Sequence, residues 1–354
     1  MTLTKDTVSA IRQQFPALSR EVDGNPAVFF DGPAGTQVPQ CVIDAIGEYL
    51  ANNNANHDGQ FATSRESDIV LHNAHEAVAQ MLNAASGDCI AFGPNMTTLT
   101  FALSRTLAQS WQTGDEIVVT RLEHDANFTP WVLAARDAGT TVRYVDINTE
   151  DCTLDLDDFR SKINVKTKLV AVGCASNAVG TINPVKDICS WARDAGAISF
   201  LDAVHYAPHA LIDVQDWDCD FLACSAYKFF GPHVGILYGR RELLESLQPY
   251  KLRPSSNDLP GRWMTGTQNH ECIAGTLAAV RYLATIGGEA SDLRNSLVTA
   301  FTKIGNFETD LMTHLIAGLE NIAGIEVYGI TDPGRFGERL PTVSFTHAKL
   351  ASRE

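Results

Sequence analysis

Lys228 and Asp202 are the residues of this chain whose types and surroundings best fit covalent chemistry. Lys228 lies in the run Ala226-Tyr227-Lys228-Phe229-Phe230, and apolar neighbours favour the neutral amine that attacks a carbonyl. Asp202 ends the apolar run Ile198–Asp202. An imine-forming lysine and a carboxylate that can pair with a pyridinium nitrogen are what pyridoxal phosphate requires. A solvated lysine after a strand is the alternative interpretation, so the pair needs support from other residues.

The elements that must position these two residues are short strands. Seven runs rich in β-forming residues alternate with helical patterns, which is typical of a parallel sheet covered by helices on both faces. We predict strands at Asp88–Phe92, Glu116–Thr120, Thr141–Val145, Leu169–Gly173, Ile198–Asp202, Phe221–Ser225 and Gly235–Tyr238. We predict helices at Thr97–Ala108, Pro130–Ala138 and Pro184–Ala195, the last with Asn183 as its N-cap. The fold class is therefore α/β.

The pattern changes after Gly287-Gly288. A long helical stretch, 290–322, is followed by strand candidates at Ile325–Tyr328 and Thr342–Phe345. We therefore predict an N-terminal arm at 1–20, a large domain at 21–286 and a smaller α+β domain at 287–354.

Polar residues follow the predicted strands, where ligands bind in open α/β sheets. The turn Gly93-Pro94-Asn95-Met96-Thr97 leads into a helix whose N-terminus can bind a phosphate, although Asn95 or Thr97 can equally serve as an ordinary cap.

The next strand ends carry an imidazole and an amide. His124 can stack on a flat ring or move protons, or it can be structural. Asn177 can donate to a phenolic oxygen or simply form a turn. Asp202 and His205 follow the fifth predicted strand. The occurrence of all these residues in order at successive strand ends is the stronger signal.

In this order the motifs resemble those of the class V aminotransferases of pyridoxal phosphate fold type I, and within them the cysteine desulfurase-related branch. The likeness covers about residues 15–350. It implies a mainly parallel seven-stranded sheet with pyridoxal phosphate on a Lys228 Schiff base. The matching family motifs place a histidine on the ring, an asparagine near its hydroxyl, an aspartate at its nitrogen and a serine at the phosphate. The residues so implied are, in the same order, His124, Asn177, Asp202 and Ser225. His205 matches the family position three residues after the aspartate, which is usually glutamine or histidine.

The resemblance also implies a homodimer with shared active sites. The segment Thr265-Gly266-Thr267-Gln268 is similar to the motif through which family members contact the phosphate held by the partner subunit. The segment Phe30–Gly35 resembles the glycine loop near the substrate. The full set of implied cofactor-binding residues is Asn95, Met96, Thr97, His124, Asn177, Asp202, His205, Ser225, Lys228 and Thr267, and the catalytic ones are Lys228, His124 and Asp202.

Two features depart from the family pattern. Many desulfurases have a histidine before the lysine, whereas this chain has Tyr227, which can still donate to a phosphate. The sequence continues only briefly beyond Thr342–Phe345, where relatives carry the arginine for the substrate carboxylate and the loop cysteine that accepts sulfur. We therefore expect an incomplete C-terminal domain. Cys272 begins an apolar helix and is expected to be packed rather than nucleophilic.

Composition limits the partners. The chain has 354 residues, 45% of them hydrophobic, and a formal net charge of −15, which disfavours nucleic acid and anionic membranes. A small-molecule amino-acid substrate fits better. We find no apolar run of membrane-spanning length and no secretory signal, and therefore expect a cytoplasmic protein. Eight cysteines show no metal-ligand spacing, so we predict reduced thiols and no metal site.

The expected function is that of a pyridoxal phosphate-dependent transferase or lyase acting on an amino acid. Both a cysteine desulfurase-like activity and a class V aminotransferase activity remain open. An alternative is a catalytically silent, cofactor-binding dimer that serves as a scaffold or regulatory protein. A nucleotide-binding α/β enzyme is disfavoured, because Gly93-Pro94-Asn95 lacks the further glycines of that motif.

Overall fold

The computed structural model describes residues 3–288 and 290–352. The predicted N-terminal arm and C-terminal domain therefore include residues outside the described ones, namely 1, 2, 289, 353 and 354. The α-helices are α1 (Lys5–Arg12), α2 (Gln40–Glu48), α3 (Ala62–Leu82), α4 (Met96–Ala108), α5 (Thr129–Ala138), α6 (Leu156–Lys162), α7 (Val185–Asp194), α8 (Val214–Trp217), α9 (Arg241–Ser246), α10 (His270–Gly287) and α11 (Leu293–Glu320). The strands are β1 (Glu21–Val22), β2 (Asn25–Pro26), β3 (Ile90–Gly93), β4 (Glu116–Thr120), β5 (Thr141–Val145), β6 (Ile147–Asn148), β7 (Thr153–Leu154), β8 (Thr167–Gly173), β9 (Ile198–Asp202), β10 (Phe221–Ser225), β11 (Gly235–Gly239), β12 (Ile325–Tyr328) and β13 (Ser344–His347).

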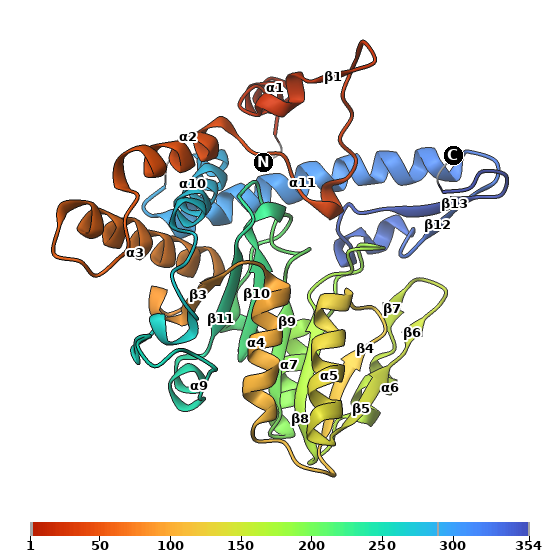
Figure 1. Cartoon of the computed structure of the whole chain (residues 1–354). Helices are drawn as coiled ribbons and strands as arrows, with labels where there is room; N and C mark the ends of the chain where they lie inside the picture. The colour runs from red at the N-terminus through yellow and green to blue at the C-terminus, as the bar shows by residue number, and fades with distance from the viewer. Residues whose placement is uncertain (1–2, 289, 353–354) are drawn as a thin grey trace.

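The predicted seven strands form one sheet in the order β3-β11-β10-β9-β8-β4-β5 (Figure 1). Neighbouring strands from β10 to β5 are parallel, whereas β11 runs antiparallel to both β10 and β3. The sheet is thus mainly parallel, as predicted. The first strand begins at Ile90 rather than Asp88, because Gly87–Cys89 forms a 3-10 turn.

The strands are buried on both faces because alternate apolar side chains point to opposite sides of the sheet. Ile117 and Leu169 pack with α4 and α5 on one face. Val118 and Val170 pack on the other face with α3, α7 and α10. This two-sided burial explains why the strands read as continuous apolar runs.

The N-terminus of α7 differs from the prediction. The helix begins at Val185, and Pro184 occupies the N-cap position without a side-chain cap. The Asn183 amide instead donates to the Gly173 carbonyl at 2.7 Å. The predicted capping role of Asn183 is therefore wrong, because a long-range contact to the end of β8 takes its side chain.

Helix α11 and the β12–β13 hairpin follow the sheet in the chain and lie along one side of it (Figure 1). The predicted helical stretch 290–322 is confirmed as α11, and β12 has the predicted bounds. The second predicted strand is shifted by two residues, to β13. The segment before it, Glu338–Leu340, pairs instead with residues 180–182 of the loop after β8.

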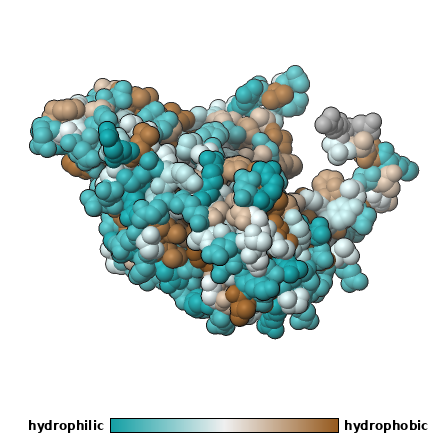
Figure 2. Space-filling view, turned by 60° about the horizontal axis from the view of Figure 1, so that its bottom comes forward, coloured by the Kyte–Doolittle hydropathy of each residue, from teal (hydrophilic) through white to brown (hydrophobic). Residues whose placement is uncertain are grey.

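The surface agrees with the acidic composition. Figure 2 shows a face on which polar residues predominate and hydrophobic residues are scattered in small groups. No helix in the described part of the chain is both long and apolar enough to cross a membrane.

The close approach of α10 and α11 depends on Gly287. A Cβ atom there would lie 2.0 Å from the Ser296 carbonyl oxygen.

We expect Gly287→Ala to lower the free energy of unfolding by about 2 kcal/mol, because the helices must separate. Gly305→Ala on α11 is the control: its Cβ meets nothing within 4 Å, and it should raise the stability by about 0.5 kcal/mol through helix propensity. Urea unfolding measures both, and a Gly287→Ala protein as stable as wild type would contradict the packing.

Candidate functional site

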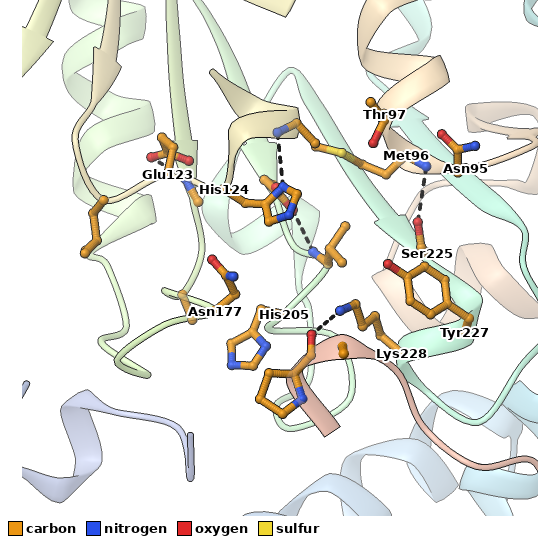
Figure 3. A pocket seen from close by; sticks show the side chains of 18 residues that line it. Asn95, Met96, Thr97, Glu123, His124, Asn177, His205, Ser225, Tyr227 and Lys228 are labelled. Atoms are coloured by element: carbon orange, nitrogen blue, oxygen red, sulfur yellow. Dashed lines mark hydrogen bonds between the residues drawn. The ribbon is translucent and has the colours of Figure 1, made fainter. Parts of the chain in front are cut away.

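A cavity of about 420 Å³ lies at the carboxyl edge of the sheet (Figure 3). Strands β3, β4, β8, β9 and β10 all end there, because they share one direction. Nine of the ten predicted cofactor-binding residues line the cavity, and Thr267 does not. The lining residues are Pro33, Ala34, Asn95, Met96, Thr97, Leu122, Glu123, His124, Ala126, Gly173, Ala175, Asn177, Asp202, Val204, His205, Ser225, Tyr227 and Lys228.

One end of the cavity is the N-terminus of α4. Asn95 caps this helix, since its side chain accepts from the Thr98 N–H at 2.8 Å, and the Met96 N–H donates to Ser225 Oγ at 3.2 Å. Gly235 pairs with both Gly93 and Ser225 at this edge, and a Cβ there would lie 2.3 Å from the Asn95 carbonyl carbon. The helix start can approach Ser225 only because residue 235 is glycine.

Asp202 lies at the end of β9 and is 7% exposed. Burial raises its pKa to about 6, although the Val204 N–H, which donates to Oδ1 at 2.8 Å, and the nearby His124 and Lys228 act in the opposite direction. The carboxylate is thus held in a place where a cationic ligand would stabilise it.

Lys228 is also 7% exposed and ends the 3-10 turn Ala226–Lys228 after β10. Burial lowers its pKa, and Asp202 opposes this shift. Its Nζ donates to the Pro33 carbonyl, which belongs to the 3-10 turn Gly32–Ala34. The same Nζ lies 5.0 Å from the centroid of the Tyr227 ring. The amine therefore faces the cavity under a loop from the N-terminal part of the chain (Figure 3).

His124 projects from the loop after β4, and its neighbour Glu123 anchors that loop. The Ala126 N–H donates to His124 Nδ1 at 3.0 Å, which leaves the proton of the neutral ring on Nε2. Glu123 accepts from Thr120 Oγ1 at 2.7 Å, the Gly173 N–H at 3.0 Å and Asn127 Nδ2 at 2.6 Å. Burial raises the Glu123 pKa to about 7. Glu123 Oε1 thus joins the ends of β4 and β8, and Oε2 holds Asn127 in the turn that follows His124.

His205 and Asn177 line the side of the cavity next to Lys228 (Figure 3). His205 Nε2 is 2.7 Å from Thr342 Oγ1, and its buried Nδ1 has no hydrogen-bond partner among the described residues. Burial, together with His209 and Lys228, lowers its pKa to about 3. The ring is therefore neutral near pH 7.

The structure brings together some residues that sequence reasoning missed and separates one that it proposed. Glu123 and Thr342 were not assigned roles, although an acid directly before His124 was a readable signal for Glu123. Pro33 lies in the segment Phe30–Gly35 that was expected near the substrate, but its contact with Lys228 was not predicted. Thr267 is exposed in the loop before α10 and lines a second cavity of about 870 Å³. Cys272 packs partly buried against the core, and burial raises its pKa, in agreement with the predicted packing role.

A model of the family described as aminotransferase class-V matches residues 28–354. The chain belongs to this family. It is 33% identical over 351 residues to a probable cysteine desulfurase of Synechocystis sp., with 97% of this chain and 81% of that protein covered. It is also 33% identical to a cysteine desulfurase of Serratia proteamaculans, with 91% and 80% covered.

Solved structures agree with this membership. An apo cysteine desulfurase from Thermococcus onnurineus superimposes with a TM-score of 0.86 at 26% identity, covering 100% of this chain and 85% of that one. A cysteine desulfurase from Escherichia coli gives a TM-score of 0.82 at 26% identity, covering 98% and 84%. Class V aminotransferases are pyridoxal phosphate-dependent enzymes, so the predicted fold and enzyme class are confirmed.

The raised pKa of Asp202 predicts a pH effect on the stability of this member of the aminotransferase class-V family. A folded-state pKa of about 6, above the ordinary value of 3.8, means that the folded protein holds the proton more tightly, so stability falls as the pH rises from 4 through 6. Asp202→Asn keeps the acceptor for the Val204 N–H. We expect it to stabilise the cofactor-free protein at pH 8 by on the order of 2 kcal/mol, and to have little effect at pH 4.

Urea unfolding of both proteins at the two pH values measures this difference. The Asp202 charge is one of the causes of the raised Glu123 pKa, so Asp202→Asn also weakens the Glu123 contribution, and this change adds to the expected gain in stability at pH 8. A stability difference that is equal at pH 4 and pH 8 would show that the Asp202 carboxyl is not desolvated.

Proposed function

We propose that this class V aminotransferase binds pyridoxal phosphate in the 420 Å³ cavity, covalently through Lys228, and acts on an amino acid. The observation that carries the proposal is the convergence of a buried lysine and a buried aspartate in one cavity, opposite a helix N-terminus. Each charged group alone is costly to bury. Together they match a ligand that carries an aldehyde, a basic ring nitrogen and a phosphate.

Two features of the cavity support the fit of this cofactor. Gly235 leaves space that any Cβ would fill, and this lets the first turn of α4 approach Ser225; free N–H groups at a helix N-terminus bind phosphate well. In addition, His205 Nδ1 is buried without a partner, and an oxygen of a bound ring would satisfy it. Ser225, Thr97 and Met96 would hold the phosphate, and Asn177 and His205 the ring oxygen.

When bound, pyridoxal phosphate supplies an electron-accepting ring that stabilises negative charge on the substrate α-carbon. Asp202 would hold a proton on the ring nitrogen. His124, whose Nε2 carries its proton, would cover one face of the ring and exclude water from it. Lys228 Nζ, whose pKa is lowered by burial, would take and return a proton at the α-carbon.

The substrate proposal rests on the relatives. Because the proteins matched above are named cysteine desulfurases, we propose cysteine as the first amino acid to test. Formation of alanine, with the sulfur recovered as sulfide only when a thiol reductant is added, would indicate desulfuration, and formation of mercaptopyruvate would indicate transamination. Absence of turnover on all amino acids with the cofactor bound would favour the silent dimeric scaffold instead.

The covalent role of Lys228 predicts a spectroscopic and a chemical result. Wild-type protein incubated with pyridoxal phosphate should show an absorbance band at the edge of the visible range that borohydride removes, and the reduced adduct should map to the peptide that contains Lys228. Lys228→Ala should form no adduct, because the amine is gone. Lys166→Ala, at an exposed lysine, is the control and should behave like wild type. An adduct at another lysine, or none, would refute the proposed function.

We further propose a homodimer in the cytoplasm in which Thr267 contacts the phosphate bound by the partner subunit. Thr267 is exposed and distant from the cavity of its own chain. Exposed large apolar side chains lie on or beside the elements around it, namely Phe61, Ile69, Tyr250 and Leu252. Large apolar side chains gathered on a solvent-exposed face are typical of a subunit interface.

Subunit mixing tests this arrangement. Thr267→Ala alone should weaken cofactor binding about tenfold, and Lys228→Ala alone should form no adduct. Co-expression of the two variants gives mixed dimers in which one site has both Lys228 and Thr267, so at low cofactor concentration roughly a quarter of the wild-type adduct should return. A monomer in sedimentation, or no recovery in the mixture, would contradict the shared site.

A further inference from the structure

Thr342 is hydrogen-bonded to His205, which lines the cavity. It lies between Arg339 and β13, outside the residues that line the cavity, and its Oγ1 is 2.7 Å from His205 Nε2. The two residues are far apart in the sequence and come from different parts of the fold. This hydrogen bond therefore connects the C-terminal segment to the wall of the proposed site.

The position of Thr342 is fixed by its backbone. Arg339 Nη2 donates to the Thr342 carbonyl at 2.6 Å, and the Leu340 N–H donates to the Gly180 carbonyl at 2.8 Å. Gly180 has a φ of +77°, and a Cβ there would lie 2.9 Å from the Thr342 carbonyl oxygen. The segment thus packs tightly on the loop that carries Asn177, and the Thr342 hydroxyl is held at a defined place.

The His205 ring can carry its single proton in two ways. It is neutral near pH 7, so one nitrogen is a donor and the other an acceptor. If Nε2 donated to Thr342, the threonine hydroxyl hydrogen would still need an acceptor, and the structure records none for it besides His205 among the described residues. If Thr342 donates to Nε2, the hydroxyl is satisfied and the proton lies on Nδ1, where it has no acceptor among the described residues until a ligand supplies one.

We infer that Thr342 is a positioning residue that donates to His205 Nε2 and so keeps the His205 proton on Nδ1, where it can be donated to an acceptor atom of a bound ligand. The buried Nδ1, which has no partner in the described chain, is the atom that such a ligand would satisfy. The use of this proton by the ligand rests on the proposed function, whereas the tautomer itself does not.

Nitrogen-15 spectra of the histidine side chains test the tautomer directly. The protein contains ten histidines, and the His205 signal is assigned by its loss in His205→Gln. Without added cofactor, wild-type protein should show the Nδ1–H form. Thr342→Val, which has nearly the same shape but no hydroxyl, should shift His205 toward the Nε2–H form. Thr342→Ser should restore the wild-type signal.

Ser344→Ala is the matched control. Ser344 lies on the same segment and its hydroxyl donates to the Ala178 carbonyl, so its loss perturbs the same packing without touching His205. We expect no change of tautomer in this variant. Cofactor affinity should fall about fivefold in Thr342→Val and stay near the wild-type value in Thr342→Ser, as the loss of one well-oriented hydrogen bond predicts.

The outcomes separate this inference from the proposed function. An Nε2–H tautomer in wild-type protein, or an unchanged tautomer in Thr342→Val, would overturn the inference even if pyridoxal phosphate binds. A Nδ1–H tautomer that depends on Thr342, in a protein that does not take up pyridoxal phosphate, would support the positioning role and refute the proposed cofactor.

Discussion

The desolvation of Asp202 is the constraint on which the arrangement of the site depends. A carboxylate at the end of a central strand loses most of its contact with water, and this cost raises its pKa to about 6. The compensating groups follow three strands that end at this edge: the Val204 N–H follows β9, the His124 ring follows β4 and the Lys228 amine follows β10. They can gather there because parallel strands bring their carboxyl ends to one edge. The sheet thus concentrates polar groups at the carboxyl ends of its parallel strands.

Much of the sheet and most of the site were predictable from the sequence, because the evidence is local. A strand buried on both faces reads as an apolar run, and β4, β5, β9 and β10 have the predicted bounds. The antiparallel direction of β11 was not predictable, because an apolar run carries no sign of the direction of its neighbours. Asn183 failed as a predicted cap for a related reason: its amide has a better partner at Gly173 in the folded chain.

The residues that sequence reasoning missed share a different property: they act through contacts between distant segments. The Pro33 carbonyl reaches Lys228 across most of the chain, and Thr342 reaches His205 from the C-terminal segment. No spacing rule links such residues, since their proximity is a result of the complete fold. Thr267 illustrates the opposite case, because a motif suggested a role that the isolated chain cannot supply from its own cavity.

The hydrogen bond between Lys228 and Pro33 has a consequence for how the empty protein meets a ligand. Conversion of the neutral amine to an imine uses both of its N–H hydrogens, so an aldehyde that reacts with Lys228 breaks the hydrogen bond to the Pro33 carbonyl, and the loop 32–34 acts as an intramolecular competitor. The strength of this competition depends on contacts that hold the loop in place, among them Thr36, whose N–H donates to the Tyr227 carbonyl at 3.0 Å and whose hydroxyl accepts from the Phe230 N–H at 2.8 Å. The apparent affinity for an aldehyde is therefore set partly by a residue that never touches it.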